Sequence, residues 1–165
     1  MMIDRDRINK NNLDIIRILG QIEILTKYEM DVFLGDFRNI QSLKYLLIQA
    51  VESIVDTCQH ILAKTKGIAC EGYVDCIVKA GKEDIIPSAL SDKLRKLCDL
   101  RNSIIHRYWI IDDTKLYTQT VANKGDLKEF VDFITYLLKQ ENDKEREKRF
   151  FLNDNLLLDI SALLS

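Results

Sequence analysis

The segment that decides the fold is residues 36–66, DFRNIQSLKYLLIQAVESIVDTCQHILAKTK. Its apolar residues recur at spacings of three and four, which places them on one face of a helix. At about 1.5 Å per residue this helix would be about 45 Å long and would form the spine of a bundle. Gly67 follows it and is typical of a helix C-cap. The face predicted to be buried comprises Ile40, Leu43, Leu47, Ala50, Ile54, Cys58 and Ile61.

The same apolar period predicts further helices on both sides of this spine. One precedes it at about residues 11–28, with a connector at 29–36, and a short one at 71–80 is closed by Gly81. A fourth helix begins at Pro87, and a fifth covers 125–140. Strand-like alternation is confined to YWII at 108–111, which is too short to matter. We therefore expect an all-α protein, an antiparallel bundle of four to six helices.

The last 25 residues differ in composition from the rest. Residues 141–149, ENDKEREKR, are almost all charged, and residues 150–165, FFLNDNLLLDISALLS, are mostly apolar. We expect one helical domain at 1–140. Residues 141–165 would form a charged linker and an amphipathic C-terminal helix that packs on the bundle or on a partner.

Composition narrows the class of protein. A chain of 165 residues with 47% hydrophobic and 30% charged residues is typical of one soluble globular domain. The first twelve residues are polar and charged, unlike a signal peptide, and no run approaches the roughly 20 apolar residues of a membrane span. We expect a cytoplasmic protein that does not contact a membrane.

The charge is unevenly distributed. A net charge of −2 argues against a general nucleic-acid coat, yet residues 92–107 carry five cations against two aspartates. Such a patch could steer an anionic substrate, although charged helix faces are usually only solvated. The cations are Lys93, Arg95, Lys96, Arg101 and Arg107.

The four cysteines are spaced irregularly and contain no C-x-x-C pair. We interpret them as structural thiols and expect no metal site and no cofactor. A zinc site would need His60 or His106 close to them in space, and the spacing does not indicate it. The cysteines are Cys58, Cys70, Cys76 and Cys98.

Functional chemistry is concentrated in residues 101–109, RNSIIHRYW. Arg101 occupies a position that the helical pattern reserves for an apolar residue. A buried arginine needs a partner, so it either forms a salt bridge with Asp92, Asp99 or a carboxylate of another helix, or it serves a binding site.

On an unbroken helix of about 100° per residue, Arg101 and Tyr108 point the same way within about 20°, whereas His106 lies about 140° from Arg101. The three side chains therefore cannot converge on one straight helix. Either the helix breaks near residues 105–109, or a second copy of the chain completes the site. A two-fold dimer would bring two copies of Arg101 and His106 to one cleft.

The residue types suit RNA cleavage without a metal ion. Arginine can hold a phosphate with two hydrogen bonds, and a histidine with a pKa near 6.5 can take or give a proton at the ribose or the leaving oxygen. Arg101 and His106 are the candidate catalytic residues. Asn102, Ser103 and Arg107 are candidates for further substrate contacts.

The segment resembles the RxxxxHxY signature of HEPN-domain proteins, in the HepT toxin branch of the nucleotidyltransferase (MNT)/HepT toxin–antitoxin systems. The match consists of Arg101, Asn102, His106 and Tyr108. A leader similar to FL-x-D (Phe33, Leu34 and Asp36), a long second helix that ends near His60, and a proline-led helix into the motif also fit, over roughly residues 11–140.

This resemblance implies a small all-α bundle that dimerises and a metal-independent endoribonuclease toxin with both motifs in a common cleft. Arg101 would contact the phosphate, and His106 would transfer protons or bind phosphate. Tyr108 resembles the tyrosine to which the nucleotidyltransferase antitoxin transfers AMP, which blocks the ribonuclease. The partners implied are RNA, this antitoxin and a second copy of the chain.

Two features depart from the family pattern. The tail at 141–165 is longer than expected, and Gln59, where the family often has asparagine, precedes His60. We interpret His60 as structural and tied to Asp56 at i to i+4, and Trp109 as a packing residue. Two other functions stay open: a non-catalytic HEPN subunit that binds nucleotides or presents its tyrosine to the partner, and a purely structural helical dimer.

Overall fold

The computed structural model describes residues 2–163, and the side chains of residues 2–152. No strand occurs within residues 2–163, so the predicted all-α fold is confirmed. The helices are α1 (Arg5–Thr26), α2 (Met30–Leu34), α3 (Phe37–Lys66), α4 (Tyr73–Lys82), α5 (Ser88–His106), the 3₁₀ helix η1 (Tyr108–Ile110), α6 (Asp113–Asn123) and α7 (Gly125–Leu163).

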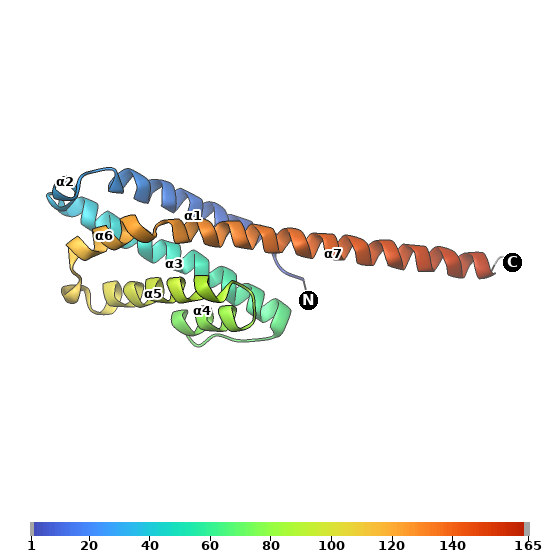
Figure 1. The fold of residues 1–165 in the computed structure, drawn as a ribbon. Helices are drawn as coiled ribbons and strands as arrows, with labels where there is room; N and C mark the ends of the chain where they lie inside the picture. The colour runs from blue at the N-terminus through green and yellow to red at the C-terminus, as the bar shows by residue number, and fades with distance from the viewer. Residues whose placement is uncertain (1, 164–165) are drawn as a thin grey trace. The chain divides into compact units, whose positions relative to one another are not determined.

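Helix α3 is the spine that the sequence predicts. The Asp36 side chain caps its first turn by accepting the Arg38 N–H at 2.9 Å. Gly67 ends it in the left-handed conformation, with φ 65°, and its N–H donates to the Ala63 carbonyl. Every residue of the predicted apolar face is buried. Helices α1, α4 and α5 pack against α3, and α1 and α3 lie side by side in Figure 1.

Helices α4 and α5 approach each other closely at Gly81. A Cβ atom at this position would lie 2.5 Å from the Ser91 Oγ, which itself donates to the Ile77 carbonyl at 2.9 Å. The predicted end of the helix at Gly81 is therefore wrong, because α4 continues to Lys82. Gly81 therefore allows α4 and α5 to pack closely, and it does not end α4.

The N-terminal boundary and the 109–124 region also differ from expectation. Helix α1 begins at Arg5, well before residue 11, because the Asp4 side chain caps it by accepting the Arg7 N–H at 3.0 Å. Helices α2 and α6 were not expected. They contact each other, and the Tyr117 ring of α6 lies 4.9 Å from the ring of Phe33, which is fully buried.

The chain divides into two compact units, Met1–Val131 and Asp132–Ser165. Helix α7 runs without a break through residues 141–149, where the sequence predicted a linker between two helices. The charged residues of this run are good helix formers, and Lys144 pairs with Glu141 at i, i+3. How residues 141–165 pack stays a prediction. In the part of the chain that the structure describes, no helix is long and apolar enough to cross a membrane.

Candidate active site at the end of helix α5

The motif at 101–109 spans the last residues of α5 and the non-helical residue that ends the helix. The last helical hydrogen bond runs from the Arg107 N–H to the Ser103 carbonyl, at 2.9 Å. Arg107 then leaves the helical region, with φ −141° and ψ 41°, and η1 follows. The sequence predicted either a helix break near residues 105–109 or a second copy of the chain, and within one chain the helix break occurs. It removes Tyr108 from the helix, whereas Arg101 and His106 stay on the same straight helix, about 140° apart.

Arg101 faces the interior, where a carboxylate of another helix holds it. Its Nη2 donates to Glu52 Oε1 on α3 at 2.8 Å and to the Tyr73 hydroxyl on α4 at 3.0 Å. The guanidinium carbon lies 3.9 Å from the centroid of the Tyr73 ring, which adds a cation–π contact. The Tyr73 hydroxyl in turn donates to the Glu52 carboxylate, 2.9 Å from each oxygen. Three helices thus fix one guanidinium.

This Arg101–Glu52–Tyr73 cluster is incompletely satisfied. The Arg101 side chain is only 12% exposed, yet its Nε is buried without a hydrogen-bond partner among the described residues. A buried donor without an acceptor costs about 1–3 kcal/mol. Glu52, by contrast, is 47% exposed at its side chain. Burial and the Glu52 carboxylate raise the pKa of Tyr73, so its hydroxyl stays protonated and able to donate.

His106 and Tyr108 lie at the surface, beyond this cluster. His106 is exposed, and its imidazole makes no hydrogen bond or ion pair with any other described residue. Tyr108 is 68% exposed and contacts the Trp109 ring edge-on, at a centroid distance of 5.3 Å. The prediction of Trp109 as a packing residue is wrong for the single chain, because Trp109 is also 68% exposed.

The remaining candidate substrate contacts are close to the motif. Asn102 Oδ1 accepts a hydrogen bond from Arg101 Nη1 at 3.3 Å, and Arg107 Nη2 donates to Ser103 Oγ at 3.0 Å. Asn102 and Ser103 are half-buried, whereas Arg107 is exposed. The structure therefore gathers all predicted polar residues at one end of α5 but leaves His106 and Tyr108 outside the Arg101 cluster.

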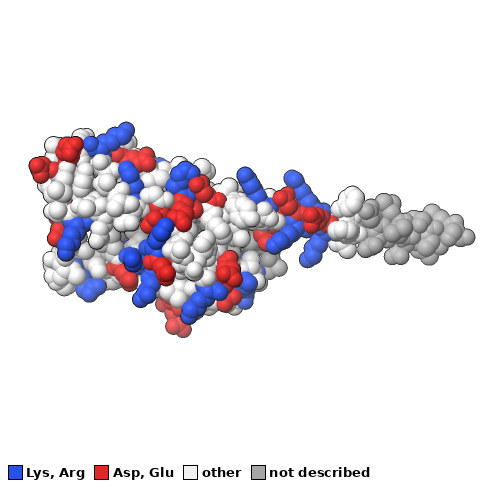
Figure 2. Space-filling model, in the orientation of Figure 1, with Lys and Arg blue, Asp and Glu red and all other residues white. Residues whose placement is uncertain are grey.

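The predicted positive patch is partly neutralised. Lys93 forms an ion pair with Glu129 at 2.9 Å and lies 3.8 Å from Asp126, and Arg101 is paired with Glu52. Figure 2 shows basic and acidic side chains interspersed on the visible face of the first unit. Two of the five cations are thus already paired within the chain.

His60 is structural, as predicted, but its partner is different. It is buried, and its Nε2 accepts the Asp4 backbone N–H at 2.8 Å. Asp56 is instead occupied by the Arg7 guanidinium and by Asn11 Nδ2. The predicted pair of His60 and Asp56 was wrong because α1 starts early enough to bring its own polar residues to this face of α3.

The cysteines fit the prediction of structural thiols. Three of them are buried, and Cys70 is half-buried. Burial raises the pKa of the Cys98 thiol to about 12, so this group stays protonated and unreactive at neutral pH.

Sequence reasoning missed Glu52 and Tyr73. Glu52 interrupts a strongly apolar part of residues 36–66, and a carboxylate there could have been matched to the arginine misplaced on the fourth helix. Tyr73 gives no such signal, since it opens a short helix after a loop. Both residues are identified only by their contacts with Arg101, which lies 49 residues from Glu52 and 28 residues from Tyr73 in the sequence.

Comparison with known proteins shows the family of this chain. A family model described as ribonuclease HepT-like matches residues 15–134, which include the whole motif. The chain belongs to the HepT-like ribonuclease family. The resemblance to the HepT branch of HEPN proteins is thus confirmed, and with it the prediction of a ribonuclease. The roles of individual HepT-like site residues stay predictions.

One relative and several structures show how far the likeness extends. The tRNA nuclease HepT of Aphanizomenon flos-aquae (strain 2012/KM1/D3) is 24% identical over 133 residues, which cover 77% of this chain and 88% of the relative. A structure of the tri-AMPylated Shewanella oneidensis HEPN toxin in complex with MNT antitoxin has a TM-score of 0.73 at 23% identity, covering 79% of this chain and 98% of that one. YutE of Bacillus subtilis, a cytosolic protein of unknown function, has a TM-score of 0.72 at 21% identity, covering 84% and 93%. These structures confirm the HEPN-type fold.

Proposed function

We propose that the protein is the toxin of a toxin–antitoxin pair and acts as an endoribonuclease that needs no metal ion. Arg101 and His106 are its catalytic residues, and two copies of the chain contribute to the site. An MNT-type nucleotidyltransferase antitoxin inhibits it by transferring AMP to Tyr108. The observation that carries the proposal is the end of α5. It exposes His106 and Tyr108, and the same helix holds an arginine that three helices fix.

The reaction that fits these groups uses the nucleophile within RNA. A base removes the proton of a ribose 2′-hydroxyl, and the 2′-oxygen attacks the adjacent phosphorus. The 5′-oxygen leaves with a proton, which gives a 2′,3′-cyclic phosphate and a 5′-hydroxyl. His106 supplies one of these proton transfers, and Arg101 stabilises the charge that develops on the phosphate. Nucleophile and electrophile belong to one substrate, so the protein has to supply only proton transfer and charge stabilisation.

A second copy of the chain completes the site. Within one chain Arg101 points toward α3 and α4, whereas His106 projects about 140° away on the same helix. Four apolar side chains close to His106 in the sequence are exposed, and a two-fold contact through them would bring a second motif beside the first. These side chains are Ile105, Tyr108, Trp109 and Ile110, which are 39%, 68%, 68% and 55% exposed.

Modification of Tyr108 would control this site. Its exposed position after the break in α5 makes the hydroxyl accessible to another enzyme. Adding AMP would place a negatively charged phosphate two residues from His106 and would compete with the phosphate of RNA for the cations there. The AMPylated toxin found with MNT antitoxin in the Shewanella oneidensis complex is consistent with this mode of inhibition.

The central experiment incubates purified, unmodified protein with total cellular RNA in the presence of EDTA. We expect cleavage products with 5′-hydroxyl ends. His106→Ala should lower the rate by about 10²–10⁴-fold, because general acid–base catalysis contributes that much. Arg95→Ala, which removes an exposed cation from the same helix, is the matched control and should cleave normally. Intact RNA with the wild-type protein would refute the proposal.

Control by the antitoxin is tested by intact-mass measurement after co-expression with an MNT-type nucleotidyltransferase. The wild-type chain should gain mass in units of one AMP, and Tyr108→Phe should gain none. Tyr136→Phe is the matched control, since Tyr136 is also exposed. Adducts that persist in Tyr108→Phe and disappear in Tyr136→Phe would overturn the assignment of Tyr108.

A non-catalytic HEPN subunit is the second candidate, because one chain alone does not bring Arg101 and His106 together. Such a subunit would bind RNA or a nucleotide and present Tyr108 to its partner. It predicts that His106→Ala leaves both RNA binding and AMP transfer unchanged and that the wild type cleaves nothing. Cleavage of RNA by the wild type, and its loss in His106→Ala, therefore separates the two candidates.

A further inference from the structure

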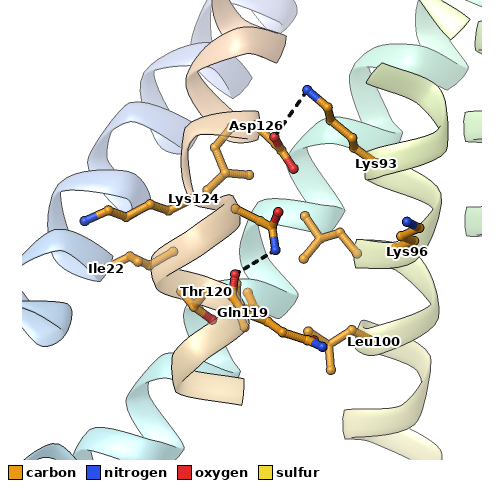
Figure 3. Close-up of a pocket in the computed structure, with 12 residues that line it drawn as sticks. Ile22, Lys93, Lys96, Leu100, Gln119, Thr120, Lys124 and Asp126 are labelled. Atoms are coloured by element: carbon orange, nitrogen blue, oxygen red, sulfur yellow. Dashed lines mark hydrogen bonds and ion pairs between the residues drawn. The ribbon is translucent and has the colours of Figure 1, made fainter. Parts of the chain in front are cut away.

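A separate cavity of about 300 Å³ lies between α5, α6 and the first turn of α7 (Figure 3). None of its lining residues belongs to the motif at 101–109. Its apolar wall is formed by Leu97 and Leu100 of α5, Leu127 of α7, and Ile22 and Leu47 of the two neighbouring helices. The volume is at the lower end of the range for small-molecule sites, roughly 300–1,000 Å³.

The polar groups of this cavity carry net positive charge. Three lysines line it against a single aspartate, Asp126. Lys93 pairs with both Asp126 and Glu129, which ties α5 to α7 at one side. Burial raises the pKa of Asp126, with Lys93 opposing that shift. Asp126 is thus paired with Lys93 and does not neutralise Lys96 or Lys124.

Lys96 is the cation available to a ligand. It is exposed and makes no ion pair with any other described residue. Lys124 points away from it in Figure 3, toward α1, where its Nζ donates to Thr26 Oγ1 at 3.4 Å. Gln119 and Asn123 of α6 also line the cavity. Asn123 Nδ2 donates to the Gln119 backbone carbonyl at 2.9 Å, and the side-chain amide of Gln119 can donate or accept hydrogen bonds.

We propose that this cavity binds a small organic anion, with its acidic group on Lys96 and its apolar body between Leu97 and Leu100. An apolar wall with a few convergent polar groups is the usual composition of a ligand site. A single ammonium available in the cavity selects a single carboxylate, sulfonate or phosphate, since Lys93 is paired with Asp126 and Glu129 and Lys124 donates to Thr26. The site is independent of the RNA-cleaving motif, and its occupancy does not require the proposed ribonuclease activity.

The test uses 1-anilinonaphthalene-8-sulfonate, an aromatic sulfonate whose fluorescence rises in apolar surroundings. Binding to the wild-type protein should weaken about tenfold or more in Lys96→Glu, because a charge-assisted contact is worth about 1.5–3 kcal/mol. Arg95→Glu makes the same change of charge one residue away, outside the cavity, and should bind as the wild type does. Equal affinities of all three proteins would overturn the site.

A second variant tests the cavity itself and not only its charge. Gln119 is exposed on α6, so Gln119→Trp introduces a large ring at the cavity without replacing a core residue. It should abolish binding of the probe while the melting temperature stays unchanged. Probe binding that survives in Gln119→Trp would place the fluorescence elsewhere, for example on the exposed side chains around Trp109, and would refute the proposal.

Competition defines the chemistry of the ligand. 1-Naphthoate combines an apolar body with one negative charge and should displace the probe. 1-Naphthalenemethanol lacks the charge, and acetate lacks the body, so neither should displace it at the same concentration. Displacement by acetate alone would show a simple anion site, and displacement by the alcohol alone a purely apolar one. Either result would contradict the proposed class of ligand.

Discussion

Two polar clusters lie on successive turns of α3, and they differ in how completely their members are paired. At Asp56 and His60, Arg7 and Asn11 satisfy the carboxylate, and the Asp4 N–H donates to the imidazole. At Glu52, one turn earlier, the carboxylate is half exposed and the arginine beneath it keeps a buried Nε without an acceptor.

The comparison suggests how the two histidines of this chain should be assigned. A cluster in which each donor has found an acceptor rigidifies the fold and has no capacity left for a ligand. A cluster with an unmatched donor and a half-exposed acceptor can exchange an internal partner for an external one. His60 belongs to the first kind, and His106, exposed near the second, remains available for chemistry.

The largest difference should appear when each cluster's arginine is replaced by lysine. Lysine cannot reproduce the planar, multiply donating guanidinium, so Arg101→Lys should lower kcat/KM for RNA by about ten- to a hundredfold. Arg7→Lys makes the same change in the satisfied cluster and should alter kcat/KM less than twofold. A larger loss of activity in Arg7→Lys than in Arg101→Lys would reverse the assignment of the two clusters.

The histidines should show the opposite pattern in stability. His60→Ala removes the acceptor of the Asp4 N–H and should cost about 1–3 kcal/mol in the free energy of unfolding, measured with urea. His106→Ala alters an exposed side chain and should change that free energy by less than about 0.5 kcal/mol. We would abandon the structural role of His60 if both substitutions were equally neutral.

A third measurement follows stability against pH. Burial, together with the charges of Arg7 and Lys64, lowers the pKa of His60, whereas Asp4 and Asp56 oppose this shift. The unfolded chain, with a histidine pKa near 6.5, then binds the proton more readily than the folded one.

The contribution of His60 is therefore complete above about pH 6.5 and is lost as the pH falls from there through the lowered folded-state pKa. The urea midpoint of the wild type should decrease over this interval, and His60→Asn should show a flatter profile. The same slope in both proteins would assign the pH dependence to other groups.

The smallest effect is expected from Tyr73→Phe. The ring beneath Arg101 remains, and only the hydroxyl that bridges Arg101 and Glu52 is lost. One hydrogen bond of about 1 kcal/mol corresponds to a change of roughly fivefold, and rearrangement of Glu52 should reduce it to two- or threefold in KM for RNA. Tyr117→Phe, whose hydroxyl donates to the Tyr28 carbonyl at 2.6 Å, is the matched control and should leave KM unchanged.

Periodicity was sufficient to predict the spine of the fold but not all of its partners. The apolar face of α3 follows from spacing alone, because burial of one face is a local property of a helix. Helix α6 was missed. It has few buried residues, and its attachment through Tyr117 to Phe33 joins segments that are far apart in the sequence.

The candidate site was predicted by residue type and only partly by geometry. Among the partners left open for Arg101, the structure shows a carboxylate of another helix. Of the break and the second copy that the angles of the motif allowed, it shows the break, whereas the second copy stays a prediction. Glu52 could not be identified, since choosing among the carboxylates requires the packing of α3 against α5. Trp109 was interpreted as a packing residue from its residue type alone, and it lies exposed beyond the end of the helix.

Because α4 and α5 approach closely at Gly81, a substitution there would also affect Tyr73, at the other end of α4. Tyr73 begins α4, eight residues or about 12 Å along the axis from Gly81. A methyl group at residue 81 would collide with Ser91 and force the two helices apart at that end. The helix would then act as a rigid arm and carry the aromatic ring away from the guanidinium beneath which it lies. The position of the Tyr73 ring under Arg101 therefore depends on the absence of a Cβ atom at Gly81.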